Sequence, residues 1–166
     1  MTNNTSYIPK LLEWFHQTYH QHNPQETPLV PLAKLSNFPK GTFGKTWADF
    51  VDRHQLTPFD YGPRRPQFHD GIHVLTGYGV DILGEAQVQA FLLGAKWHPL
   101  NLIFGLALSK KAKTVVDQTQ LRQSLISAYQ RGRASHFDPD TWEPKRYWHL
   151  PLETVRNQLN ILPPAS

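Results

Sequence analysis

The segment from residue 68 to residue 91 constrains the fold most strongly, because it combines helical spacing with three glycines. It reads F-H-D-G-I-H-V-L-T-G-Y-G-V-D-I-L-G-E-A-Q-V-Q-A-F. His69 and His73 are four residues apart, so on a helix they lie on one face. A glycine inside a helix costs about 1 kcal/mol relative to alanine, which disfavours one straight helix across all three. The segment therefore predicts two helices joined near residues 77–79, with the second returning towards the histidine face.

Four side chains of this segment form a candidate metal site: His69, Asp70, His73 and Glu85. Asp70 lies about 100° round a helix from His69, so its carboxylate can swing to the edge of the histidine face. Two imidazoles and two carboxylates suit zinc, iron or another divalent ion. The alternative is a pair of hydrogen-bonded core histidines with solvated carboxylates, since 9 histidines in 166 residues give some such pairs by chance.

The same segment resembles the Coq-four family of ubiquinone (coenzyme Q) biosynthesis proteins. The shared pattern is H-D-x-x-H, then G-E after the two-glycine turn, then x-x-V-x-x-F, and it covers His69 to Phe91 here. The block L-S-N-F-P-K-G-T-F-G-K-T-W-A-D-F upstream and the block W-H-L-P-L-E-T-V-R-N-Q-L-N-I downstream are also similar to the family. The resemblance therefore covers residues 34–164 in three ordered blocks.

The resemblance implies an all-α, peripherally membrane-associated protein, often a homodimer, that handles polyprenyl quinone precursors beside other quinone-biosynthesis enzymes. The implied metal ligands, which are also the implied catalytic residues, are His69, Asp70, His73 and Glu85. Zinc is the ion that the resemblance favours, with iron, cobalt or magnesium as alternatives. The implied chemistry is a lyase reaction, in which the ring carboxyl group is removed, with hydroxylation at the same carbon.

The amino-acid composition limits the number of domains, the possible metal ligands and the possible partners. A chain of 166 residues with 39% hydrophobic content fits one domain with its own core, expected over residues 1–166. The absence of cysteine excludes disulfides and thiolate ligands. A net charge of +4 weakly favours anionic lipid surfaces or phosphorylated ligands. Because the basic residues are scattered rather than gathered in a stripe, nucleic acid is not an expected partner.

The N-terminal residues M-T-N-N-T-S-Y have neither the charged region nor the apolar core of a secretory signal. They are also not an arginine-rich transit peptide. We therefore expect a cytoplasmic protein of the prokaryotic type, peripherally associated with the inner or plasma membrane.

Helical spacing of apolar residues predicts four further helices and extends the second helix of the 68–91 segment, which runs from near Val80 to Gly94. The four cover residues 8–21, residues 46–54 capped by Thr46, residues 117–131 with Gly132 as C-cap, and residues 151–160. Residues 24–45, 57–67 and 133–147 are expected to form connectors. No strand-like alternation is present. The sequence therefore predicts an all-α, single-domain bundle of about six or seven helices.

The apolar run over residues 92–108 has two interpretations. Lys96, His98, Pro99 and Asn101 interrupt it, and it is shorter than the roughly 20 residues that a transmembrane helix needs. The default interpretation is a core helix. The other is that the run lines a groove for an isoprenoid tail or lies against a membrane face, with the following S-K-K-A-K near anionic headgroups.

Other polar clusters are weaker candidates. The histidines at positions 16, 20 and 22 fit the polar face of a surface helix better than a metal site. Arg64 and Arg65 could contact a phosphate or lipid headgroup, or only solvent. His136, Asp138 and Asp140 could extend the H-D pair towards a phosphohydrolase, which the rest of the sequence does not favour.

Two functions follow from these observations. The first is a metal-dependent, oxidative or non-oxidative decarboxylase of a prenylated 4-hydroxybenzoate-type precursor. Two histidines and one carboxylate leave open positions of the kind iron oxygenases use, whereas four protein ligands fill a tetrahedral zinc and indicate a structural site. The alternative is a non-catalytic scaffold that binds an isoprenoid lipid and presents quinone precursors to other enzymes, as residues 92–108 suggest.

Overall fold

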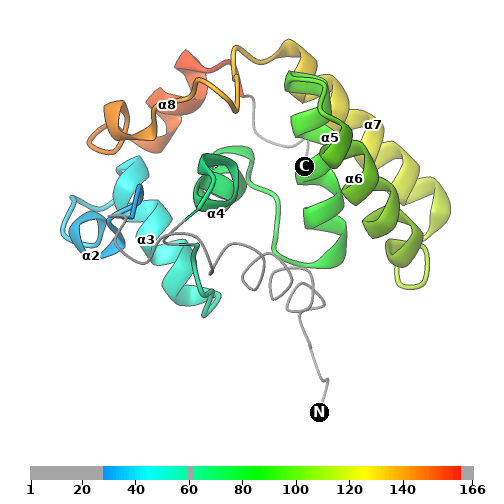
Figure 1. The fold of residues 1–166 in the computed structure, drawn as a ribbon, viewed down its shortest axis with the longest axis horizontal. Helices are drawn as coiled ribbons and strands as arrows, with labels where there is room; N and C mark the ends of the chain where they lie inside the picture. Colours follow the sequence, from blue (N-terminus) through cyan, green and yellow to red (C-terminus); the bar gives the residue numbers. More distant parts are fainter. Residues whose placement is uncertain (1–27, 60–61, 162–166) are drawn as a thin grey trace.

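The computed structural model describes residues 28–59 and 62–161, and within these ranges the fold is all-helical (Figure 1). The elements are α2 (Leu32–Leu35), α3 (Phe43–Arg53), α4 (Arg64–Thr76), α5 (Ile82–Ala95), α6 (Pro99–Ala112), α7 (Gln118–Ala134), the 3-10 helix η1 (Pro144–Arg146) and α8 (Leu152–Gln158). The described part of the chain has no strand, only an isolated bridge between Thr42 and Pro151. These findings confirm the all-α prediction, whereas the helix predicted over residues 8–21 lies outside the described residues.

Helix α4 occupies the middle of the molecule (Figure 1), where it contacts α3, α5 and α8. Helix α5 packs against both α6 and α7. A cluster of aromatic rings fills the space between α3, α4 and the loop before η1. Trp142 in that loop stacks on Trp47 at 6.2 Å between ring centroids and meets Phe68 edge-on at 5.8 Å. The core thus holds the N-terminal half of α4 in place.

Helix α3 begins three residues before the predicted start. The side chain of Thr42, rather than Thr46, caps it by accepting a hydrogen bond from the backbone N–H of Lys45. Phe43 is fully buried. The cap therefore lies where the helix enters the core, inside the segment predicted to be a connector, which also contains the short α2.

Helix α4 begins at Arg64, inside the predicted turn-rich segment 57–67, and ends at Gly77. Gly77 adopts the left-handed conformation with φ of 77°, which glycine reaches without a Cβ penalty. Arg156 on α8 donates to the backbone carbonyls of Val74 and Leu75 at 3.0 and 2.9 Å. These guanidinium hydrogen bonds satisfy the last carbonyls of α4 and place positive charge at the negative end of the helix dipole.

Helices α5 and α7 approach each other through small residues. A Cβ at Gly132 would lie 2.0 Å from the carbonyl oxygen of Phe91, and one at Gly94 would lie 2.1 Å from that of Tyr129. The prediction that Gly132 is a C-cap is therefore wrong, because α7 continues to Ala134.

The prediction of a core helix over residues 92–108 is wrong. Lys96 and His98 are extended, so the run is divided between the end of α5 and the start of α6. The large exposed apolar residues here are Trp97 (70%), Leu100 (45%), Leu102 (41%), Ile103 (58%) and Leu106 (64%). Among the described helices only α5 packs extensively against α6, and the residues named here remain exposed. No helix within the described ranges is long and apolar enough to span a bilayer.

Candidate metal centre

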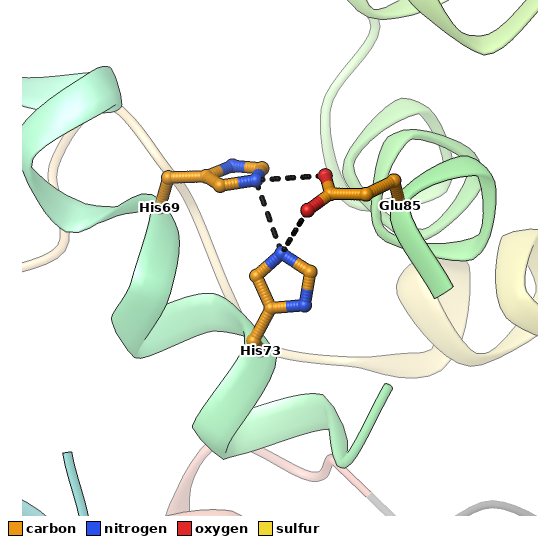
Figure 2. Close-up of side chains that lie close together, drawn as sticks. All are labelled: His69, His73 and Glu85. Atoms are coloured by element: carbon orange, nitrogen blue, oxygen red, sulfur yellow. Dashed lines mark hydrogen bonds and ion pairs between the residues drawn. The ribbon is translucent and has the colours of Figure 1, made fainter. Parts of the chain in front are cut away.

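Three of the four predicted ligands converge between α4 and α5. Figure 2 shows His69 and His73 projecting from α4 towards Glu85 on α5. The Nε2 atoms of the two histidines are 3.1 Å apart. Glu85 places one carboxylate oxygen 3.1 Å from His69 Nε2 and the other 3.2 Å from His73 Nε2. Two helices and the turn between them therefore assemble a two-histidine, one-carboxylate triad.

The backbone of the α4–α5 turn orients the imidazole of His73. Its Nδ1 lies 3.2 Å from the carbonyl oxygen of Tyr78, which can only accept a hydrogen bond, so Nδ1 carries the proton. In neutral His73 the Nε2 lone pair then faces the rest of the triad. Phe50 stacks on the ring at 5.8 Å between centroids. A second hydrogen bond that fixes the tautomer in this way is the usual arrangement for a metal-binding histidine.

Glu85 is negatively charged at neutral pH. Burial alone raises the pKa of its carboxyl, but the charge of His69 and the hydrogen bonds of both histidines outweigh burial and hold the pKa at about 2. The pKa of His69 is raised, since burial lowers it but the Glu85 carboxylate raises it more. The triad therefore presents a buried anion that favours a positive charge between these side chains.

The donor set fits a divalent cation. With Nδ1 of His73 protonated, its Nε2 lone pair faces a Glu85 oxygen, and two acceptors at 3.2 Å repel each other unless a proton or a cation lies between them. Tetrahedral zinc with bonds of about 2.0–2.1 Å separates its ligand atoms by about 3.3 Å, close to the distances of the triad. The three residues are also the set that leaves positions open for substrate or water.

Asp70, the fourth predicted ligand, is not part of this group of three. Its side chain is half-buried, and burial, partly offset by His69 and His73, raises the pKa of its carboxyl. Its role as a metal ligand stays a prediction.

An apolar cavity of about 170 Å³ opens beside the triad. His69 and Glu85 form part of its wall, so the candidate metal centre faces the cavity. Its apolar walls include Phe68, Ile72, Leu92, Leu100, Phe104, Leu108, Phe137 and Trp142. Residues from both halves of the 92–108 run therefore line a groove, in agreement with the second interpretation of that run.

The sequence analysis missed two polar residues of this cavity, Gln89 on α5 and Asn101 on α6. Both are buried, with exposed fractions of 8% and 7%. Gln89 is one helical turn after Glu85, so its spacing from a candidate ligand could have identified it. Asn101 was noted only as an interruption of the apolar run.

The two arginines considered for headgroup binding have partners within the chain. Arg64 donates to the carboxylate of Glu143 at 2.9 Å, and Arg65 donates from Nε to Asp140 at 2.7 Å. Asp140 also lies 3.0 Å from Lys96 at the end of α5. These ion pairs join the start of α4 and the end of α5 to the loop before η1.

Fold and site together define an all-helical protein with a candidate metal centre in the wall of an apolar cavity. No family model matches the chain. It is 26% identical over 161 residues to the mitochondrial ubiquinone biosynthesis protein COQ4 homolog of Mus musculus, covering 86% of this chain and 60% of the relative. It is 28% identical over 171 residues to the Xenopus tropicalis protein of the same name, covering 86% and 57%. The chain thus spans about 60% of the length of the curated relatives it matches.

A crystal structure of a candidate ubiquinone biosynthesis protein from Nostoc punctiforme shares the fold, with a TM-score of 0.68. The two chains are 18% identical, and the match covers 93% of this chain and 77% of the other. The chain is thus similar in sequence to COQ4 proteins and shares its fold with this structure, which confirms the resemblance seen in the sequence.

Proposed function

We propose that this chain acts in the biosynthesis of a ubiquinone-type quinone, as a metal-dependent decarboxylase of a polyprenylated aromatic precursor. One observation supports the proposal most strongly. His69 and Glu85 of the triad and apolar residues of α6 line the same cavity. The names of the curated relatives support the pathway. An aromatic ring with a prenyl tail suits such a cavity, because it combines a polar reacting end with a large apolar surface.

The residues of the triad have distinct parts in the proposed reaction. His69, His73 and Glu85 would hold a divalent ion, which would supply Lewis-acid stabilisation of negative charge on the ring substituents during decarboxylation. His73, oriented by the Tyr78 carbonyl at Nδ1, directs its Nε2 at the site, where that atom would bind the ion. The apolar walls exclude water and so strengthen the electrostatic interactions of the buried Glu85.

The outcome at the ring carbon depends on the co-reactant. In simple decarboxylation a proton replaces the carboxyl group, whereas in oxidative decarboxylation a hydroxyl group replaces it and an oxidant such as dioxygen is consumed. Zinc supports only the first, because it has no redox chemistry. If Asp70 is a fourth ligand of a tetrahedral zinc ion, no coordination position is left for substrate, and the metal has a structural role.

The first test is elemental analysis of the purified protein for zinc, iron, cobalt and magnesium. We expect near-stoichiometric metal in the wild type and its loss in His73→Ala, with metal retained in the control His149→Ala, whose side chain is exposed. The same three proteins are then assayed for carbon dioxide release from a prenylated 4-hydroxybenzoate. Undiminished turnover in metal-free His73→Ala protein of normal helix content would refute the proposal.

A non-catalytic scaffold at a membrane surface is the second candidate, favoured by the exposed apolar side chains of α6. These are followed by Lys110, Lys111 and Lys113, whose charge complements anionic headgroups. In this proposal the protein sits peripherally on the inner or plasma membrane and passes quinone precursors to other enzymes, with homodimers as the assembly implied by the resemblance. Native mass spectrometry after mild extraction should then show a retained isoprenoid lipid without turnover.

A further inference from the structure

Two buried amides at the cavity each have one polar atom without a hydrogen-bond partner. Among the described residues, no group bonds to Oε1 of Gln89 or to Nδ2 of Asn101. Both side chains are more than nine-tenths buried and both line the cavity beside the triad. An unpaired buried amide is destabilising, and more than nine in ten buried polar groups in proteins have a partner. Two such amides in one apolar wall therefore need an explanation.

A third buried amide, Gln67 on α4, shows the ordinary arrangement. Its Oε1 accepts from the backbone N–H of Leu29 at 3.0 Å, and its Nε2 donates to the carbonyl of Gly62 at 2.8 Å. Gln67 is 5% exposed, so its burial matches that of Gln89. Gln67, which has a structural role, therefore has hydrogen-bond partners for both its oxygen and its nitrogen. Gln89 and Asn101, which line the cavity, each have an atom without a partner.

The two amides are placed next to the candidate metal centre. Gln89 follows Glu85 by four residues, so both side chains lie on one face of α5. Asn101 reaches the cavity from α6, which contacts α5 near this point, since a Cβ at Gly105 would lie 3.5 Å from the Cβ of Gln89. A ligand ring beside the triad would therefore carry its substituents past both amides.

The chemistry of the pair selects a neutral group that both donates and accepts. Each amide offers a carbonyl acceptor and an N–H donor but no charge. A phenolic hydroxyl can donate a hydrogen bond to the carbonyl oxygen of one amide and accept one from the N–H group of the other. An anionic group would need a cation, and the guanidinium of Arg65 in this wall is paired with Asp140.

From these observations we infer that Gln89 and Asn101 bind the phenolic hydroxyl of the aromatic ligand and so fix the orientation of its ring relative to the triad. The inference rests on the proposed function, because it assumes a prenylated aromatic ligand in this cavity. It assigns the two residues a positioning and specificity role, separate from metal binding.

The binding test compares 2-geranylphenol with its O-methyl ether, which keeps the apolar bulk but cannot donate a hydrogen bond. We expect wild-type protein to bind the phenol about tenfold more tightly, as one hydrogen bond in a buried site allows. Gln89→Leu should weaken phenol binding about tenfold and leave ether binding unchanged, because it removes the acceptor of the phenol's hydrogen bond. Asn101→Leu should weaken the binding of both compounds, because the ether oxygen can still accept from Nδ2. Isothermal titration calorimetry measures all six affinities on the full chain.

Thermal unfolding without ligand supplies an independent readout. Gln89→Leu removes an unpaired buried amide and should raise the Tm by about 2–6 °C, whereas Gln67→Leu breaks two hydrogen bonds and should lower it by a similar amount. A residue with only a structural role would lose stability on substitution. If Gln89→Leu does not fold, Gln89→Met tests the same point.

Two results would overturn the inference. If the leucine variants bind the phenol as the wild type does, the amides face only cavity water; the proposed function then stands as long as His73→Ala still loses metal and turnover. If wild-type protein binds neither geranyl compound, the cavity does not take prenylated aromatic ligands. In that case the substrate part of the proposed function fails together with the inference.

Discussion

Helix α5 meets its two neighbouring helices in different ways. On the α7 side, Gly94 and Gly132 bring the two backbones so close that a Cβ at either position would collide with a carbonyl oxygen. On the α6 side, Gly105 is in ordinary contact distance of Gln89, and residues of both helices line the cavity. The same helix is therefore in close backbone contact on one face and borders a cavity on the other.

The difference indicates how the chain combines stability with a binding site. Glu85 and Gln89 lie on the open side of α5, where side chains reach the cavity. The tight α7 contact supports the helix that carries them. Helix α6 presents apolar side chains both to the cavity and to the surroundings.

The largest expected effect is on the tight side. Gly132→Ala places a Cβ 2.0 Å from the Phe91 carbonyl oxygen, a backbone atom that cannot move aside alone. We expect the free energy of unfolding to fall by about 3 kcal/mol or more, because overpacking outweighs the gain of about 1 kcal/mol in helix propensity. Urea denaturation measures it. Gly105→Ala is the matched control and should be neutral or slightly stabilising; equal losses in both variants would contradict the comparison.

The second prediction concerns the open side. Glu85→Gln keeps the shape of the side chain but removes the buried negative charge of the triad. We expect metal affinity to fall by more than about 100-fold, since even outer partners of metal ligands contribute 10- to 100-fold. Competition with a chromogenic chelator measures the affinity, and Glu153→Gln on α8 is the exposed control. Unchanged metal affinity in Glu85→Gln would exclude Glu85 as a ligand.

A smaller effect is expected on the outer face of α6. Leu106 is 64% exposed, and Leu106→Lys should weaken binding to vesicles of mixed neutral and anionic lipids about fivefold, through loss of buried apolar area. Stability should change by less than about 0.5 kcal/mol. Ile126→Lys on α7, where Ile126 is 45% exposed, is the control on the tight side. Equal losses from both variants would remove the distinction between the two faces.

The smallest effect concerns the ion pairs between Lys96 at the end of α5 and the loop before η1. Hydrogen bonds from Arg65 and then from Lys96 hold the pKa of Asp140 at about 2. The unfolded value is about 3.9. Because the folded pKa is the lower one, the stabilisation is present above pH 4 and is lost as the pH falls towards 2.

With side chains about 40% exposed, this ion-pair contribution is below about 1 kcal/mol. The difference in unfolding free energy between wild type and Asp140→Asn should therefore be measurable at pH 5 in low salt and absent near pH 2. A difference that does not change with pH would show that the ion pairs do not produce it.

Part of the fold and site could be predicted because it depends on local signals. Helical spacing and the glycines around residue 77 predicted that α4 and α5 turn back on each other, and that turn brings His69, His73 and Glu85 together. The cap at Thr42 was missed because Thr46 offers the same local chemistry, and only burial of Phe43 against the core distinguishes the two sites.

Other features depend on contacts distant in the sequence. Gly132 resembles a C-cap until the backbone of Phe91 is known to lie against it. The apolar run over residues 92–108 predicts burial, but burial requires a neighbour on each side, and among the described helices only α5 packs extensively against α6. Gln89 and Asn101 could not be recognised as unpaired without the list of contacts that surrounds them.

The Asp81 cap at the start of α5 also sets the direction in which Glu85 points from that helix. Asp81 accepts from the backbone N–H groups of Leu83 and Gly84, both at 2.9 Å, and so fixes where the rotation of α5 begins. Each residue inserted between this cap and Glu85 would rotate the carboxylate by about 100° and remove it from the histidines. An insertion before Asp81 only lengthens the turn. In homologous chains the four-residue interval from the cap to the glutamate should therefore be constant, while the number of residues before the cap can vary.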